Sequence, residues 1–254
     1  MNRKLLLIEQ DREQKEHFTN LIKDHGYHIK SVDNSQQASS SLSQERYDLL
    51  IIDIDLPQTA EELLIYCQSL KKDSRFHDIP VVVLTYRKDA KKIARALEAG
   101  TDRLILKPFE LDSLLNQMEV IFKEIELKKQ GKKVLDTNYI EFLIKLASEI
   151  RRKDFFLLAP VIFNRLIISK ISVLIGEPII MVIIKRLNDL TEEDCGFMKA
   201  VKLQNAHILM DGVDKVSKGV SVERISRGFR NYVFGFLQLV GILTSDILLE
   251  QRKI

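Results

Sequence analysis

Apolar and polar positions alternate in blocks along the first half of the chain. Short apolar runs are separated by longer polar segments in which apolar residues recur at helical spacing. A short run that is apolar throughout is typical of a strand buried on both faces of a sheet. The predicted strands are Lys4–Ile8, Tyr27–Val32, Leu49–Ile52, Val81–Leu84 and Leu104–Leu106.

The segments between these runs are predicted to be helices. Phe18, Leu21 and Ile22 give the first segment one apolar face, and Gly26 ends it. The remaining helices are predicted at Ser35–Arg46, Glu61–Lys72, Lys88–Ala99 and from Leu111 to about Ile125. Strands that alternate with helices predict an α/β domain, in which a parallel sheet carries helices on both faces.

Reactive side chains follow four of the predicted strands. Glu9, Asp53, Thr85 and Lys107 each stand at or just after the carboxyl end of a different strand. Ligands of open parallel sheets bind at this edge. Any one of these residues alone is better explained as a helix cap or as surface decoration. The joint placement of two acids, a hydroxyl and an amine predicts a functional site.

Three segments carry a resemblance to a known family. YDLLIIDIDLP around Asp53, IPVVVLTYR around Thr85 and AGTDRLILKPF around Lys107 resemble the response-regulator receiver family in order and spacing. The resemblance covers residues 1–127, half of the chain. It implies a flavodoxin-like, doubly wound sheet of five parallel strands in the order 2-1-3-4-5.

The resemblance also implies a role for each site residue. Asp53 would be the nucleophile that accepts a phosphoryl group from a sensor histidine kinase or a phosphotransfer protein. Mg²⁺ would bind to Glu9, to Asp53 and to the backbone carbonyl of Asp55, with Gln10 reaching it through a water. Lys107 would pair with Asp53 and then with a phosphoryl oxygen.

The switch is implied in the same way. The Thr85 hydroxyl would move to the phosphoryl group, and the population shift would be read on the face of the fourth and fifth strands. The peptide bond between Lys107 and Pro108 is expected to be cis, because the family has such a bond there.

Several positions depart from the family pattern. Gln10 replaces the second of two adjacent acids, which predicts weaker Mg²⁺ binding. Tyr86 stands where the family prefers a small residue, and Leu104 stands where it has an aromatic switch residue. The loop after Asp53, LPQTAE, lacks the usual glycine. These departures leave open a second interpretation, a pseudo-receiver that acts as a scaffold without phosphorylation.

The second half is predicted to be all-helical. KKQGKK marks a linker, so the predicted domains are a receiver at 1–127, a linker at 128–135 and a helical output or dimerisation domain at 136–254. Its helices are expected at about 137–152, 155–175, 179–190, 191–215 and 221–250. Pro178 favours a fresh helix start, and glycines 228, 235 and 241 would allow close helix contacts.

Composition narrows the function classes. Residues 1–127 carry 18 Lys and Arg against 22 Asp and Glu, whereas residues 128–254 carry 21 against 14. Cys67 and Cys195 form no paired motif, which suits a reducing cytoplasm, and no uncharged run is long enough for a transmembrane segment. No catalytic constellation follows residue 130, so an enzyme is not expected.

DNA binding is a third interpretation. Val216–Phe229 faintly resembles the first part of a helix-turn-helix, but the apolar segment that follows does not suit a recognition helix. A turn between two bundle helices explains it better. The apolar runs Phe155–Ile184 and Val233–Leu249 could touch a membrane or a partner, although buried core helices explain them better.

Overall fold

The computed structural model describes residues 3–55, 59–86, 89–130, 133–191, 193–204, 207–243 and 247–250. The predictions for the loop at 56–58, for Lys88 and for linker residues 131–132 lie outside these ranges. The chain consists of two compact units, Met1–Ile121 and Phe122–Ile254. The division between them falls inside a helix, whereas the predicted linker lies at 128–135.

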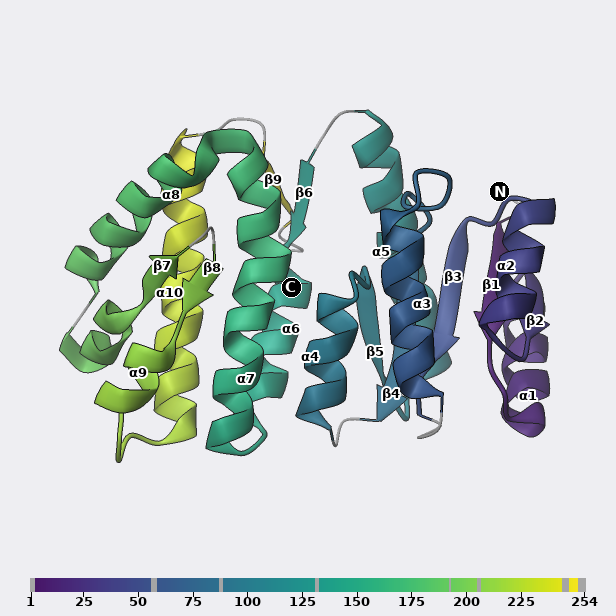
Figure 1. The fold of residues 1–254 in the computed structure, drawn as a ribbon, viewed down its shortest axis with the longest axis horizontal. Helices are drawn as coiled ribbons and strands as arrows, with labels where there is room; N and C mark the ends of the chain where they lie inside the picture. Colours follow the sequence, from purple (N-terminus) through teal and green to yellow (C-terminus); the bar gives the residue numbers. More distant parts are fainter. Residues whose placement is uncertain are drawn as a thin grey trace. The chain divides into compact units, whose positions relative to one another are not determined.

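The first unit contains the predicted five-stranded sheet. Its order is β2-β1-β3-β4-β5, and every neighbouring pair is parallel, which confirms the predicted topology (Figure 1). The strands are β1 (Lys4–Ile8), β2 (His28–Val32), β3 (Leu49–Asp53), β4 (Val81–Tyr86) and β5 (Arg103–Lys107).

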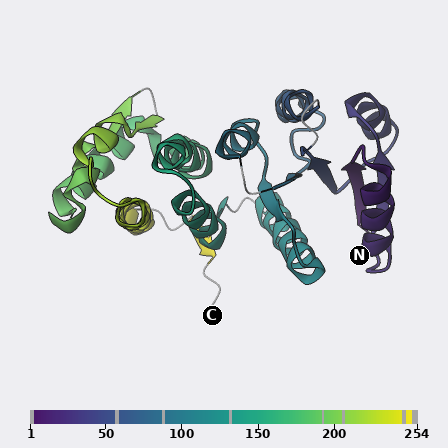
Figure 2. The ribbon, with the colours of Figure 1, turned by 90° about the horizontal axis from the view of Figure 1, so that it is seen from below.

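Helices cover both faces of this sheet, as predicted. The helices are α1 (Arg12–Lys23), α2 (Ser35–Gln44), α3 (Ala60–Lys72), α4 (Ala90–Glu98) and α5 (Leu111–Lys129). Figure 2 shows α2, α3 and α4 on one face and α1 on the other, together with the part of α5 that belongs to this unit. The Ser35 hydroxyl donates to Glu62 at 2.6 Å and ties α2 to α3.

The central strands are buried because both faces of the sheet are covered. All five residues of β3 are buried, and so are Leu5 to Ile8 of β1. Side-chain oxygens then start three of the helices: Asp11, Asn34 and Asp89 each accept a backbone N–H of the first helical turn. Each helix therefore starts shortly after the strand that precedes it.

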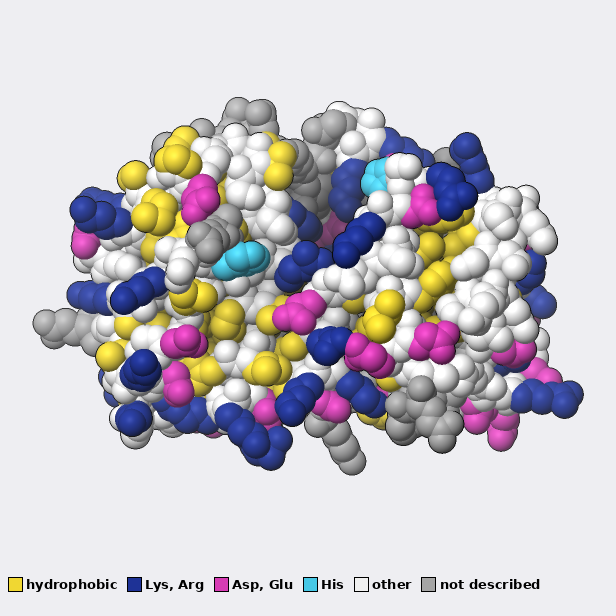
Figure 3. Space-filling view, viewed as in Figure 1, with side chains coloured by type: hydrophobic (Ala, Val, Ile, Leu, Met, Phe, Trp, Pro, Cys, Tyr) yellow, Lys and Arg dark blue, Asp and Glu magenta, His cyan; other side chains and the backbone are white. Residues whose placement is uncertain are grey.

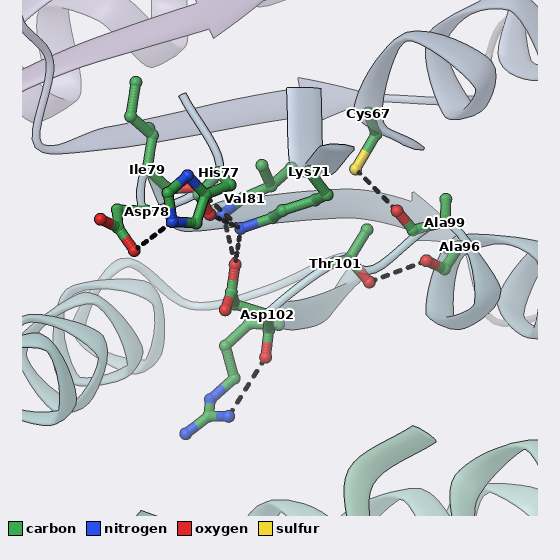
Figure 4. A network of polar contacts seen from close by, with 11 residues as sticks. Cys67, Lys71, His77, Asp78, Ile79, Val81, Ala96, Ala99, Thr101 and Asp102 are labelled. Carbon is green, nitrogen blue, oxygen red and sulfur yellow. Dashed lines mark hydrogen bonds and ion pairs between the residues drawn. The ribbon is translucent and has the colours of Figure 1, made fainter. Parts of the chain in front are cut away.

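Lys71 stabilises the amino-terminal ends of β4 and β5 through hydrogen bonds and an ion pair. The Lys71 ammonium donates to the Ile79 carbonyl at 2.8 Å and to the Asp102 Oδ2 atom at 2.7 Å (Figure 4). The same carboxylate oxygen accepts the Val81 N–H at 2.9 Å. One charged pair thus fixes the end of α3, the loop after it and the starts of two strands, at the edge opposite the candidate site.

The second unit is mainly helical, whereas the sequence predicted helices alone. Its described helices are α6 (Thr137–Ser148), α7 (Arg152–Phe163), a π-helix (Asn164–Ile168), α8 (Ser169–Leu190), a 3-10 helix (Glu193–Ala200), α9 (Asp211–Val216) and α10 (Val222–Leu243).

Two short sheets add to this helical unit. β6 (Lys133–Asp136) pairs in parallel with β9 (Ile247–Glu250), and β7 (Lys202–Gln204) pairs antiparallel with β8 (His207–Leu209). The predicted helix at 191–215 is therefore wrong, because a 3-10 helix, a hairpin and a short helix replace it. The last helix, predicted at 221–250, ends at Leu243 in the structure, and residues 247–250 form strand β9 instead.

The long apolar segment from α7 to α8 is only partly buried. Gly176 interrupts α8 with φ +76°, and the chain becomes helical again near Pro178, as its sequence favoured. Residues 152–190 form a helical segment, interrupted at Gly176, that is long and apolar enough to cross a membrane by length and composition. Of its most apolar stretch, 33% is buried.

The exposed part of this segment differs from the sequence prediction of a buried core helix. Val173 is 77% exposed and Val182 67% exposed, while Ile179 and Met181 are also exposed. Figure 3 shows apolar side chains at the surface of this unit over α8. The prediction holds for the buried residues of α7 but not for this stretch of α8.

Aromatic rings form the core of the second unit. Phe163 contacts Phe229 and Phe236 edge to face, with ring centroids 6.2 and 5.2 Å apart. A residue of α7 stabilises the turn before α10, because the Arg152 guanidinium donates to the Val220 carbonyl and to the Ser217 hydroxyl. The helix-turn-helix-like segment thus consists of the turn between α9 and α10 and the first two turns of α10.

Candidate functional site

The carboxyl edge of the first sheet brings the four predicted residues to adjacent strands. Glu9 follows β1, Asp53 ends β3, Thr85 lies in β4 and Lys107 ends β5. Asp53 is in register with Leu84, and Thr85 is in register with Leu106. Parallel pairing therefore aligns these ends, as the sequence predicted.

Lys107 and Asp53 form a direct ion pair. The Lys107 ammonium donates to the Asp53 Oδ2 atom, and their side chains are 10% and 6% exposed. Lys107 also donates to the Gln14 Oε1 atom at 3.2 Å and lies 3.4 Å from the Asp55 Oδ2 atom. The peptide bond from Lys107 to Pro108 is cis, as expected.

The neighbouring carboxylates keep this lysine charged. Burial lowers the pKa of Lys107, but the hydrogen bond and charge of Asp53, with the charges of Asp55 and Glu9, outweigh it. The pKa of Lys107 therefore lies above its usual value. A protonated amine here neutralises negative charge at the Asp53 carboxylate.

Glu9 faces Asp53 and shares its environment. Burial, together with the hydrogen bond and the charge of Asp53, raises the pKa of Glu9 to about 7. The Asp11 N–H donates to the Glu9 Oε1 atom at 2.8 Å, which fixes the side chain in this position. The carboxyl groups of Glu9 and Asp53 thus lie close together at the carboxyl edge of the sheet.

The Asp55 side chain has a place in the site that the sequence did not reveal. Its Oδ1 atom accepts the Thr85 hydroxyl at 2.8 Å and the Tyr86 N–H at 3.0 Å. Only the backbone carbonyl of Asp55 was expected to contribute. The spacing of Asp53 and Asp55 was the available signal, since buried Ile54 lies between them and places both acids near the same edge.

The acidic groups fit a magnesium ion that keeps most of its waters. Glu9 and Asp53 offer carboxylates, whereas Gln10 accepts a long hydrogen bond from the Thr59 hydroxyl at 3.4 Å. Within the described part of the chain, no three Asp, Glu, His or Cys side chains are grouped to hold a metal. Since Mg²⁺ binds through one or two carboxylates with several waters, this donor set suits it but predicts weak binding.

Tyr86 and Leu104 occupy different environments. Tyr86 is 50% exposed, and its ring centroid lies 5.4 Å from the Lys107 ammonium, within range of a cation–π contact. Leu104 is buried in β5 and carries no ring that could turn between two positions. Of these two residues, Tyr86 is therefore the one that places an exposed aromatic ring at this edge.

Comparison with known proteins identifies the first unit. Residues 5–119 match the family model of the response regulator receiver domain, so this part of the chain is a receiver domain of a response regulator. The "Response regulator MprA" of Mycobacterium ulcerans is 27% identical over 128 residues, which cover 50% of this chain and 53% of that protein. The MprA of Mycobacterium bovis is 28% identical over 123 residues, covering 48% and 52%. The chain thus spans about half the length of the curated relatives it matches.

Solved receiver domains also resemble this unit. The receiver domain of a signal transduction histidine kinase from Syntrophus aciditrophicus is 30% identical, with a TM-score of 0.44 and coverage of 48% of this chain and 90% of that one. The receiver domain of the sensor histidine kinase PA1611 from Pseudomonas aeruginosa is 20% identical, with a TM-score of 0.44 and coverage of 48% and 99%. It was solved with a magnesium ion in its active-site cleft.

Proposed function

We propose that the chain is a phosphorylation-controlled regulator of a two-component phosphorelay. Asp53 accepts a phosphoryl group from a sensor histidine kinase or a phosphotransfer protein, and the helical unit binds a protein partner or dimerises in response. The chain acts as a cytoplasmic regulator and not as an enzyme with a turnover of its own. The supporting observation is the buried ion pair between Asp53 and Lys107 at the sheet edge.

The chemistry needs little beyond positioning and charge. The P–N bond of a phosphohistidine breaks while a P–O bond to the Asp53 carboxylate forms, and the histidine ring keeps the electron pair and takes up a proton. Negative charge spreads over the phosphoryl oxygens, so a nearby ammonium stabilises the transition state. Lys107 supplies that ammonium.

Glu9 and Asp53 would hold the magnesium ion, with the Asp55 carbonyl as a third oxygen. A bound Mg²⁺ would supply further positive charge at the phosphoryl oxygens. The missing acid at Gln10 makes this the weakest part of the site. The proposal therefore includes a requirement for magnesium concentrations well above those of a three-carboxylate site.

Intact-mass spectrometry after incubation with Mg²⁺ and acetyl phosphate tests the proposal. We expect one phosphoryl adduct on the wild type, none on Asp53→Ala and a normal adduct on Asp48→Asn. Asp48 precedes the same strand at the opposite edge, where it accepts the Lys4 N–H, so it is a matched control. A wild type without adduct would instead favour the phosphorylation-independent scaffold.

DNA binding is a second candidate, favoured by one observation on α10. Arg224, Arg227 and Arg230 are exposed on the first half of this helix, although Arg230 pairs with Glu141 at 2.7 Å. Phosphate contacts from arginines would make binding depend steeply on salt. A gel shift with genomic fragments tests it, and absence of binding at low salt would exclude this function.

A further inference from the structure

The Thr85 hydroxyl is already engaged by Asp55. Thr85 is 1% exposed, and its hydroxyl donates to the Asp55 Oδ1 atom at 2.8 Å. The Tyr86 N–H donates to the same oxygen at 3.0 Å, which fixes the carboxylate against the end of β4. Two donors from consecutive residues therefore converge on one carboxylate oxygen.

A threonine hydroxyl has a single hydrogen to donate. While that hydrogen is bonded to Asp55, it is not available to an oxygen of a group on Asp53. A hydrogen bond to a carboxylate is about twice as strong as one between neutral groups. In the unphosphorylated site, the Thr85 hydroxyl is thus bound to Asp55 by a strong hydrogen bond that is largely shielded from water.

The other oxygen of Asp55 has a second influence. The Oδ2 atom is buried without a hydrogen-bond partner among the described residues, and it lies 3.4 Å from the Lys107 ammonium. Asp55 therefore attracts both groups that a phosphoryl group on Asp53 would need. Its side chain is only 17% exposed, so water screens this attraction weakly.

We propose that the Asp55 carboxylate is a latch that holds the Thr85 hydroxyl in the unphosphorylated state. A phosphoryl group on Asp53 must displace this hydroxyl from Asp55 before the switch is complete. Asp55 is thus a positioning residue that opposes the active state and sets how readily it is reached. This inference rests on the proposed phosphoryl acceptance by Asp53.

Fluoroberyllate, a stable mimic of the phosphoryl group, measures the latch. Its affinity for the full chain is determined in saturating Mg²⁺ by fluorine NMR for the wild type and for Asp55→Asn. Asparagine keeps the shape of the side chain and an acceptor for the Tyr86 N–H but removes the charge. We expect Asp55→Asn to bind about tenfold more tightly, the factor that corresponds to ~1.4 kcal/mol.

A second pair of backgrounds separates the latch from simple charge repulsion. Thr85→Val keeps the branched shape and removes the hydroxyl, whereas Thr85→Ser keeps the hydroxyl. If Asp55 acts through Thr85, the gain from Asp55→Asn persists in the serine background and falls below about twofold in the valine background. Asp48→Asn, which removes an equal charge at the far edge, should leave the affinity unchanged.

Each outcome decides between explanations. An equal gain in the valine and serine backgrounds would show that Asp55 acts by charge alone and would overturn the latch. An unchanged affinity of Asp55→Asn would overturn it as well. Failure of the wild type, Thr85→Ser and Asp55→Asn alike to bind fluoroberyllate or to form an acetyl phosphate adduct would contradict the proposed function itself. A phosphorylated wild type with no effect of Asp55→Asn contradicts only the latch.

Discussion

The Lys107 ammonium and the Asp53 carboxylate form an ion pair in which neither side chain is more than 10% exposed. Removing the amine would leave Asp53, Glu9 and Asp55 close together without a neutralising charge. We expect Lys107→Met to lower the free energy of unfolding of the receiver unit by about 2 kcal/mol at pH 8. Urea unfolding measures this change, and a smaller loss at pH 5 would follow from protonation of Glu9. An equal loss at both pH values would mean that the loss is one of packing.

Glu9 makes the stability of the metal-free protein depend on pH. Its pKa rises on folding from the ordinary value of 4.5 to about 7, so the folded state binds its proton more tightly than the unfolded chain does. This contribution to stability is complete below pH 4.5 and is lost as the pH rises through 7. Glu9→Gln should therefore be more stable than the wild type at pH 8, by on the order of 2 kcal/mol, and show no such gain at pH 4.5. Urea unfolding in a chelator compares the two, and parallel pH profiles would contradict the shift.

Gln10 limits the affinity for magnesium. A carboxylate at this position would add a charged oxygen beside Glu9 and Asp53, and hard cations favour such ligands. We expect Gln10→Asp to bind Mg²⁺ about tenfold more tightly, or ~1.4 kcal/mol. Calorimetric titration measures this affinity. Gln14→Asp, which also adds an acid near the site, serves as the control. An unchanged affinity of Gln10→Asp would mean that residue 10 does not reach the metal.

Two glycines of α10 allow close packing to different extents. A Cβ atom at Gly228 would lie 2.9 Å from the Phe197 ring and 3.3 Å from the Cys195 sulfur, whereas one at Gly235 would meet only the end of the Leu187 side chain. Gly228→Ala should cost about 1–2 kcal/mol through overpacking. Gly235→Ala should be nearly neutral, because alanine's helix propensity offsets a contact that a flexible side chain can relieve. Thermal unfolding of both variants checks this, and equal effects would contradict the distinction.

The positions of β1, β3 and β4 followed from the sequence because buried parallel strands are mostly apolar. Lys4–Ile8 was predicted with the bounds that the structure has, and β4 extends the predicted Val81–Leu84 by two residues. The convergence of Asp53 and Lys107 followed from the same topology. The position of the Asp55 carboxylate could not be predicted, because it depends on a side-chain torsion and on donors supplied by β4.

The hairpin of β7 and β8 could not be predicted for a different reason. Strands of three residues carry no periodic pattern, and their neighbours decide the structure. Ile208 is held by Asn164, whose side chain accepts the Ile208 N–H at 2.6 Å and donates to its carbonyl at 3.2 Å. These bonds join two segments that lie far apart in the sequence. The local sequence does not contain this contact, and on its own it favoured a helix.

The parallel pairing of β6 with β9 has a consequence for synthesis of the chain. β6 is made before any helix that belongs wholly to the second unit, but its partner is made after all the described ones. During translation, the backbone groups of β6 that face β9 therefore cannot pair with β9 until almost the entire unit has left the ribosome. The nascent unit can pack its helices early, yet it joins its first and last strands only when residues 247–250 emerge.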